Sequence, residues 1–258
     1  MKILRKIINK FDKSLNWFKI KFLNYSQFDF IIGPEIKNDF FYSAIYHISM
    51  DIRFKNFLEI GSSSGQGSTS AFVAGMNSRS DQSAIKLICL ELSNKRFERL
   101  KHYYNKIPFI KIYNLSSVGV SKFPPLADVE NFYINRKTNL NDTPFEEVKE
   151  WYEADIRYIL ESGKDIDGIE SIKRRLSITH FDVVLIDGSE FTGNAELDSV
   201  LGADVILLDD TESYKCREAF ERLMINSSYN LQMHEPGLRG GFAIFSKQDI
   251  SDILKTIS

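Results

Sequence analysis

From residue 56 onward, short apolar segments typical of buried strands alternate with segments that have helical periodicity. The first strand is expected at residues 56–60, between a helix from Glu35 to about Met50 and another from Ser68. Further strands are expected at 85–90, 109–113, 181–186 and 204–208, and further helices at 94–104, 194–201 and 214–223. This alternation predicts an α/β fold, because parallel strands need crossover connections, usually helices, that cover both faces of the sheet.

The end of the chain departs from that alternation. Strands are expected at 229–233 and 241–245, with too few residues between them for a helix. Two strands so close together predict an antiparallel hairpin. We therefore expect a mostly parallel, seven-stranded sheet whose last strand is antiparallel.

Residues 122–176 form the one long interruption of the pattern, within a domain that we expect to span 33–258. The segment Phe123-Pro124-Pro125 breaks regular structure, and Thr143-Pro144 is typical of the start of a helix. We interpret 122–176 as a helical insertion that forms a lid over the carboxyl edge of the sheet.

Residues 1–32 are expected to contain a separate basic, amphipathic helix. Residues 1–25 carry seven lysine and arginine side chains against a single aspartate, and apolar residues recur there at steps of three and four. Two roles stay open for this helix. It packs on its own domain or in a homodimer, which we favour, or it contacts an anionic membrane surface.

Composition excludes several classes of protein. The formal net charge of −2 over 258 residues argues against a nucleic-acid partner, which a basic domain would bind. Two cysteines are too few for a disulfide framework. No apolar run approaches the roughly 18–20 residues that span a bilayer. These features predict a soluble, cytoplasmic protein, with contact to a membrane surface left open.

A glycine-rich loop follows the first expected strand directly. It reads Glu59-x-Gly61-x-x-x-Gly65-x-Gly67, so it lacks the dinucleotide fingerprint Gly-x-Gly-x-x-Gly. Ligands of open α/β sheets bind at the carboxyl ends of the strands, where a glycine turn brings the backbone close to them. The loop therefore predicts a ligand site there, although a glycine turn alone is a weak signal.

Glu91 ends the next expected strand, 24 residues after Gly67. A carboxylate at this position can accept hydrogen bonds from both hydroxyls of a ribose. The alternative is an ordinary acid that caps the helix starting near Asn94.

The segment from Phe57 to Gly67, together with Glu91, resembles the first two motifs of class I S-adenosylmethionine-dependent methyltransferases. The closing hairpin is also similar to theirs and distinguishes the chain from a dehydrogenase. The resemblance implies a Rossmann-like, doubly wound fold with S-adenosylmethionine as cofactor, and it places Ser117 near the adenine. The cofactor-binding residues that it implies are Glu59, Gly61, Ser62, Gly65, Gly67, Glu91, Ser117 and Asp187.

Three carboxylates are expected at the same edge of the sheet. Asp187 ends one strand, and Asp209 and Asp210 end the next. Acids this close repel one another unless a cation joins them, and an all-oxygen set suits Mg²⁺. The alternative is that Asp187 contacts the cofactor while Asp209 and Asp210 cap the following helix.

The acids resemble those of the metal-dependent macrocin and catechol O-methyltransferases. The similarity extends over Leu207–Asp210 and Cys216–Ala219, and it implies that Asp187, Asp209 and Asp210 bind Mg²⁺. It also places Glu190 at the position of the general base, where that group usually has lysine or histidine, so Glu190 and Asp187 are the expected catalytic residues. The usual Pro-Gly-Gly turn is absent.

Together the two resemblances imply a methyltransferase that moves a methyl group from S-adenosylmethionine to a hydroxyl with the help of Mg²⁺. The expected acceptor is a sugar, a polysaccharide or another small metabolite. The alternative is a non-methylating tailoring protein, hydroxylase-like, or a cofactor-binding subunit on the same fold. Lys215 and Arg239 are expected to be ordinary solvated charges, and Cys89 a core residue.

Overall fold

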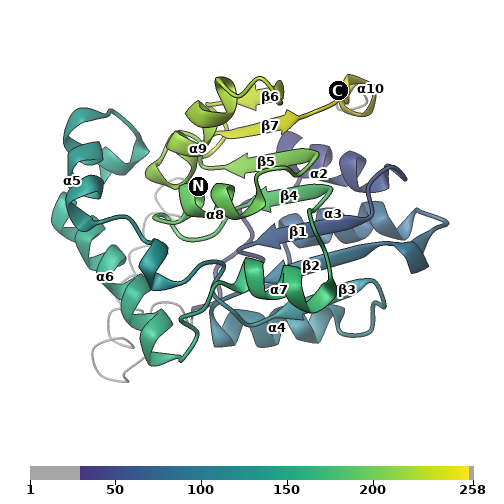
Figure 1. The fold of residues 1–258 in the computed structure, drawn as a ribbon, viewed down its shortest axis with the longest axis horizontal. Helices are drawn as coiled ribbons and strands as arrows, with labels where there is room; N and C mark the ends of the chain where they lie inside the picture. Colours follow the sequence, from purple (N-terminus) through teal and green to yellow (C-terminus); the bar gives the residue numbers. More distant parts are fainter. Residues whose placement is uncertain (1–29, 256–258) are drawn as a thin grey trace, which may run out of the picture.

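The computed structural model describes residues 30–255 (Figure 1). The helix expected within 1–32, with its proposed dimer or membrane role, falls almost wholly outside the described residues. Among the described residues, no helix is both long enough and apolar enough to cross a membrane.

A seven-stranded sheet forms the centre of the described chain. Its strands, in spatial order β3-β2-β1-β4-β5-β7-β6, are parallel except β7, which runs antiparallel to both neighbours. The expected fold class and the closing hairpin are therefore confirmed. The strand bounds are β1 Asn56–Ile60, β2 Lys86–Leu90, β3 Ile110–Tyr113, β4 Val183–Ile186, β5 Val205–Asp209, β6 Asn230–Glu235 and β7 Phe242–Ser246.

Helices cover both faces of the sheet. Helices α2 Phe40–Met50, α3 Ser68–Asn77, α4 Asn94–Tyr104 and α10 Ser251–Leu254 contribute to the apolar cluster on one face. Helices α7 Gly168–Leu176, α8 Gly193–Val200 and α9 Tyr214–Met224 contribute to the cluster on the other face. The helix expected from Glu35 begins only at Phe40, because the Asp39 side chain accepts a hydrogen bond from the Tyr42 amide and caps it there.

Strand β4 shows how the strands hold the two layers together. Val183 and Leu185 pack into the cluster of α2 and α3, whereas Val184 and Ile186 pack into the cluster of α7, α8 and α9. All four are fully buried. A strand covered on both faces is apolar at every position, which is why its sequence is a continuous apolar run.

The segment 123–161, which we name the cap, contains α5 Leu126–Asn135 and α6 Phe145–Glu161. In Figure 1 the cap lies beyond the carboxyl ends of the parallel strands. It has an apolar cluster of its own, into which Phe191 and Tyr214 of the main domain also pack. Helix α7, inside the same expected insertion, instead packs on the sheet through Ile169 and Ile172. The cap is thus fixed to the domain through aromatic contacts.

The contact between α2 and α3 supplies a test of the packing. A Cβ added at Gly75 would lie 1.9 Å from Ser49 Oγ and 2.4 Å from the Tyr46 carbonyl oxygen. Gly75→Ala gains about 1 kcal/mol of helix propensity, but the overpacking costs about 1–3 kcal/mol. We expect a net loss in the free energy of unfolding, measured in urea. Gly237→Ala, where the added Cβ meets nothing within 4 Å, is the matched control. Equal stability of the two variants would contradict the close approach.

Candidate functional site

A cavity of about 260 Å³ opens at the carboxyl ends of β1, β2 and β4. The strap of residues 32–36 and the cap both contribute to its wall. Its polar lining comes from the glycine loop, from the segments that follow β2, β3 and β4, and from α4, α6 and α9. The polar and glycine positions are Gly33, Glu35, Gly61, Ser62, Ser63, Ser64, Gln66, Gly67, Ser68, Glu91, Arg96, Ser116, Ser117, Asp155, Asp187, Gly188, Ser189, Thr192 and Lys215. This is where ligands bind in open α/β sheets.

The glycine loop turns sharply against β4. Gly61 has φ +83°, and a Cβ there would lie 1.8 Å from the Asp187 carbonyl oxygen. Ser63 also has a positive φ, of 49°. Gly67 is the N-cap of α3 and lines the cavity. Glycine at position 61 is therefore required by the contact between two strand ends, as well as by the turn.

Glu59 lies beneath the loop, and the structure does not place it in the cavity wall. Its Oε2 accepts hydrogen bonds from the hydroxyls of Ser62 and Thr69, both at 2.7 Å. Burial raises the pKa of Glu59. Gly65 likewise lies outside the lining, and its carbonyl accepts a hydrogen bond from Tyr104. These two residues shape the loop, while Gly61, Ser62 and Gly67 face the cavity.

Glu91 lines the cavity at the end of β2. One carboxylate oxygen accepts a hydrogen bond from the Ser63 amide and the other from the Ser93 amide, each at 2.7 Å. Burial raises its pKa. Each carboxylate oxygen has a second lone pair, so Glu91 can fix the loop and still accept hydrogen bonds from a ligand.

Ser117, which the resemblance places near an adenine, bonds to Glu196, an acid that the sequence analysis did not single out. The Ser117 hydroxyl donates to Glu196 Oε1 at 2.5 Å, and Thr192 donates to the same oxygen at 2.8 Å. Glu196 is fully buried, and burial raises its pKa. Its Oε2 has no hydrogen-bond partner among residues 30–255. A single glutamate within a helical pattern gives no signal of this role.

The three predicted acids do come together. Asp187, Asp209 and Asp210 each offer a carboxylate oxygen within 4.8 Å of the others. Burial raises the pKa of Asp187, and Asp209 and Asp210 raise it further. Burial also raises the pKa of Asp209, to about 6. Of the three, only Asp187 lines the cavity.

Lys215 and Arg239 are not the solvated charges expected from the sequence. Lys215 Nζ lies 2.9 Å from Asp187 Oδ1 and 2.6 Å from Asp210 Oδ2, and its side chain is 11% exposed. Arg239 Nη2 lies 2.9 Å from Asp209 Oδ1. Burial alone would lower the pKa of Lys215, but the surrounding carboxylates raise it well above its ordinary value. Lys215 is therefore a cation within the cluster.

These ion pairs also decide against helix capping by Asp209 and Asp210. Helix α9 begins after Ser213, and its N-cap makes no side-chain capping bond. The carboxylates of the two aspartates bond to Arg239 and Lys215 instead. Asp210 also has φ +59°, a backbone strain of the kind found at functional sites.

Glu190, the predicted base, is held next to the cluster but outside the cavity lining. Its Oε1 accepts hydrogen bonds from the Ser213 hydroxyl and, at 3.3 Å, from the Lys215 amide. Burial raises its pKa, which Lys215 partly offsets.

Asp155 is a cavity residue that the sequence analysis missed. It comes from α6 of the cap, is 8% exposed, and accepts a hydrogen bond from the Ser189 hydroxyl. Burial raises its pKa to about 7, and Glu190 adds to the shift while Arg96 and Lys215 oppose it. Nothing in the local sequence marks Asp155 among the other acids of α6, because the cap's packing brings it to the cavity.

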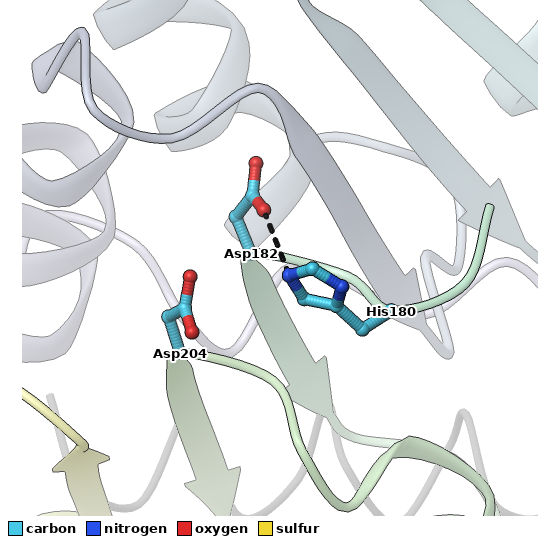
Figure 2. Close-up of side chains that lie close together, drawn as sticks. All are labelled: His180, Asp182 and Asp204. Atoms are coloured by element: carbon cyan, nitrogen blue, oxygen red, sulfur yellow. Dashed lines mark ion pairs between the residues drawn. The ribbon is translucent and has the colours of Figure 1, made fainter.

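A second cluster, of His180, Asp182 and Asp204, lies at the opposite edge of the sheet (Figure 2). Its two acids already have protein partners. Asp182 accepts hydrogen bonds from the amides of Lys55 and Asn56, and Asp204 pairs with Lys247 at 3.3 Å. These contacts explain the cluster as a tie between strand ends and loops.

Comparisons with known proteins locate similar folds. No family model matches the sequence, and no curated protein does. Cofactor-bound Rv0187 from MTB is 14% identical, with 84% of each chain covered and a TM-score of 0.49. The O-methyltransferase from Bacillus cereus in complex with SAH is also 14% identical, with 84% of each chain covered and a TM-score of 0.46. A methyltransferase from Geobacter sulfurreducens is 10% identical, with a TM-score of 0.46. The match covers 83% of this chain and 81% of that one.

The raised pKa of Asp155 predicts a pH-dependent effect on stability. Between about pH 4 and 7 the folded chain keeps a proton on Asp155 that the unfolded chain releases, so this carboxyl disfavours folding increasingly as the pH rises. Asp155→Asn removes that penalty. We expect the free energy of unfolding of the variant, relative to that of wild type, to rise by about 2–3 kcal/mol at most from pH 5 to pH 8.

Urea unfolding at the two pH values measures this difference. Asp142→Asn, which changes an exposed aspartate, is the matched control and should give the same difference at both. A difference for Asp155→Asn that does not change with pH would contradict the raised pKa.

Proposed function

We propose that the protein is an S-adenosylmethionine-dependent methyltransferase that methylates a hydroxyl of a sugar, a polysaccharide or another small metabolite. One observation carries the proposal: a single cavity at the carboxyl ends of β1, β2 and β4 is lined by both the glycine loop and Glu91. The antiparallel β7 between β5 and β6 adds support, because it departs from the all-parallel order of dehydrogenases.

The residues of the cavity fit such a cofactor. Glu91 can accept hydrogen bonds from the ribose hydroxyls, and Gly61 and Gly67 of the loop line the same cavity. On the side that the resemblance assigns to the adenine, Ser117 lines the cavity and bonds to Glu196, whose buried Oε2 has no partner within residues 30–255. An amino group is the kind of donor that such an orphaned acceptor suits.

When bound, S-adenosylmethionine supplies a methyl group on a sulfonium that an oxygen nucleophile can accept as the S–C bond breaks. The chain's part is to hold the acceptor hydroxyl and to remove its proton. Asp155, Ser189 and Lys215 line one cavity and are joined by charge and hydrogen bonding. Asp155 takes the proton, because its carboxylate faces the cavity and its pKa of about 7 suits a base.

The sequence analysis proposes Glu190 as this base. Glu190 stays the second candidate, since it contacts Lys215 and Ser213, but it lies outside the cavity lining. A base must come within hydrogen-bonding reach of the proton that it removes. Asp155 meets that requirement with less movement.

The cavity wall also bears on the acceptor class. The cap contributes Phe123 and Ile159 to the lining, so the acceptor contacts apolar surface as well as acids. Asp155 and Asp187 in this wall disfavour a polyanion such as a nucleic acid, whose phosphates need basic partners. A neutral hydroxyl compound, such as a sugar, suits this wall.

The sequence-based hypothesis also includes Mg²⁺ bound at Asp187, Asp209 and Asp210. The oxygen donors suit that ion, and one oxygen of each residue lies within 4.8 Å of the others. However, the Lys215 ammonium contacts two of the three carboxylates, and Arg239 contacts the third. This arrangement does not fit Mg²⁺ unless Lys215 is displaced. The proposed reaction therefore does not involve the metal.

The proposed cofactor contact predicts that Glu91→Ala weakens S-adenosylmethionine binding by about 1.5–3 kcal/mol, the scale of hydrogen bonds to charged groups. Isothermal titration calorimetry measures this affinity. Glu98→Ala, an exposed glutamate on α4, is the matched control and should bind as wild type does. Unchanged affinity in Glu91→Ala would remove the ribose assignment. Absence of binding to the wild-type protein would overturn the proposed function itself.

The proposed base predicts the pH dependence of methyl transfer. The wild-type rate should rise with pH through about 7, because Asp155 must be ionised, and level off above it. Asp155→Asn should lower the rate about 10²–10⁴-fold and lose this limb, with cofactor affinity unchanged. Formation of S-adenosylhomocysteine with a panel of hydroxylated acceptors measures it. Loss of the limb in Glu190→Gln, with the limb retained in Asp155→Asn, would reassign the base.

A further inference from the structure

The ammonium of Lys215 lies where the sequence predicts a divalent cation. Nζ is 2.9 Å from Asp187 Oδ1 and 2.6 Å from Asp210 Oδ2, so it bridges the ends of two neighbouring strands. A lysine ammonium has three N–H donors. One donates to Asp187 Oδ1 while the ammonium also pairs with Asp210, and Lys215 lines the cavity, where a remaining N–H can meet a ligand oxygen.

The backbone around Lys215 holds it at this place. Its amide donates to Glu190 Oε1 at 3.3 Å. Its carbonyl oxygen lies so close to the start of α8 that a Cβ added at Gly193 would be 1.9 Å away. The following residue, Cys216, is fully buried. Lys215 therefore cannot move away from the acids by a shift of the start of α9 alone, and only rotation of its side chain could release them.

The negative charge of the cluster is largely offset without a metal, to a net −1. Asp187, Asp209 and Asp210 contribute three negative charges, and Lys215 and Arg239 contribute two positive ones. A divalent cation at the same oxygens would lie next to the ammonium and be repelled by it. Binding of the metal would also leave Lys215, a mostly buried cation, without its two partners.

We propose that Lys215 is the resident cation of this site, occupying the position of a divalent metal, and that its remaining donor holds the acceptor oxygen. The second part rests on the proposed function, whereas the first concerns the cluster alone. The site is then independent of metal, and the three acids serve to fix the lysine rather than to bind Mg²⁺. Lys215 then contacts the acceptor directly.

The test uses Mn²⁺, a paramagnetic substitute for Mg²⁺. Electron paramagnetic resonance measures its binding to the full-length protein. Wild type should show no stoichiometric site at Asp187, Asp209 and Asp210. Lys215→Ala should bind Mn²⁺ at least about tenfold more tightly than wild type, because the repelling charge is gone and the oxygens are free. A further Asp209→Asn change in that variant should remove the gain.

Two controls separate this result from others. Lys122→Ala removes a lysine that pairs with Asp167 elsewhere, and it should not gain a Mn²⁺ site. Lys215→Arg keeps a cation in the cluster and should bind no Mn²⁺, which keeps the test decisive if Lys215→Ala fails to fold. A wild-type Mn²⁺ site that Asp209→Asn abolishes would overturn the proposal, as would a lack of any gain in a folded Lys215→Ala.

The same samples keep this proposal distinct from the proposed function. Calorimetry with S-adenosylmethionine, in the presence of a chelator, tests whether the cofactor binds, whatever the cation. A Mn²⁺ gain in Lys215→Ala without cofactor binding in wild type would support the resident cation and overturn the methyltransferase. Cofactor binding together with a Mn²⁺ site in wild type would support the methyltransferase and overturn the resident cation.

Discussion

The parallel pairing of β1 with β4 is the contact on which the site depends. Ile60 pairs with Ile186, so both strands end at the same level of the sheet. The chain leaves β1 through Gly61, against the Asp187 carbonyl oxygen, with no space for a Cβ. The glycine loop and the first acid of the cluster are thereby brought to one edge, although more than a hundred residues separate them in the sequence. The cavity is the space between these two strand ends and the cap.

Placing acids at a buried edge creates an electrostatic cost that the surrounding elements offset. Burial raises the pKa of Asp187, Asp209 and Glu190. Lys215 from α9 and Arg239 from the β6–β7 turn supply the opposite charge. Arg239 has φ +56°, a backbone conformation in which residues other than glycine are strained. The hairpin therefore closes the sheet and also stabilises a carboxylate at the end of β5.

The cap adds chemistry that the sheet lacks. Its aromatic contacts, Tyr152 of α6 with Phe191 and Phe132 of α5 with Tyr214, hold the cap against the strand ends. That packing directs Asp155 to Ser189, which follows β4, across 34 residues of sequence. An insertion with its own apolar cluster can change without loss of the sheet. The base that we propose on the cap and the cofactor loop that we propose on the sheet thus belong to separately packed parts of the molecule.

The sequence by itself determined the strands, the closing hairpin and the glycine loop. These features depend on local patterns: continuous apolar runs, short connections, and glycines after a strand. The bounds of α4, Asn94–Tyr104, follow in the same way from Ser93, which caps it through its side chain. The convergence of Asp187, Asp209 and Asp210 also followed, because neighbouring parallel strands end at one edge. Only the tertiary structure decided which cations pair with which buried acids. Lys215 lies 28 residues from Asp187, and Arg239 lies 30 from Asp209. A charged residue in a helix or turn has the same local pattern whether it faces water or a buried carboxylate, and the packing of distant elements determines which.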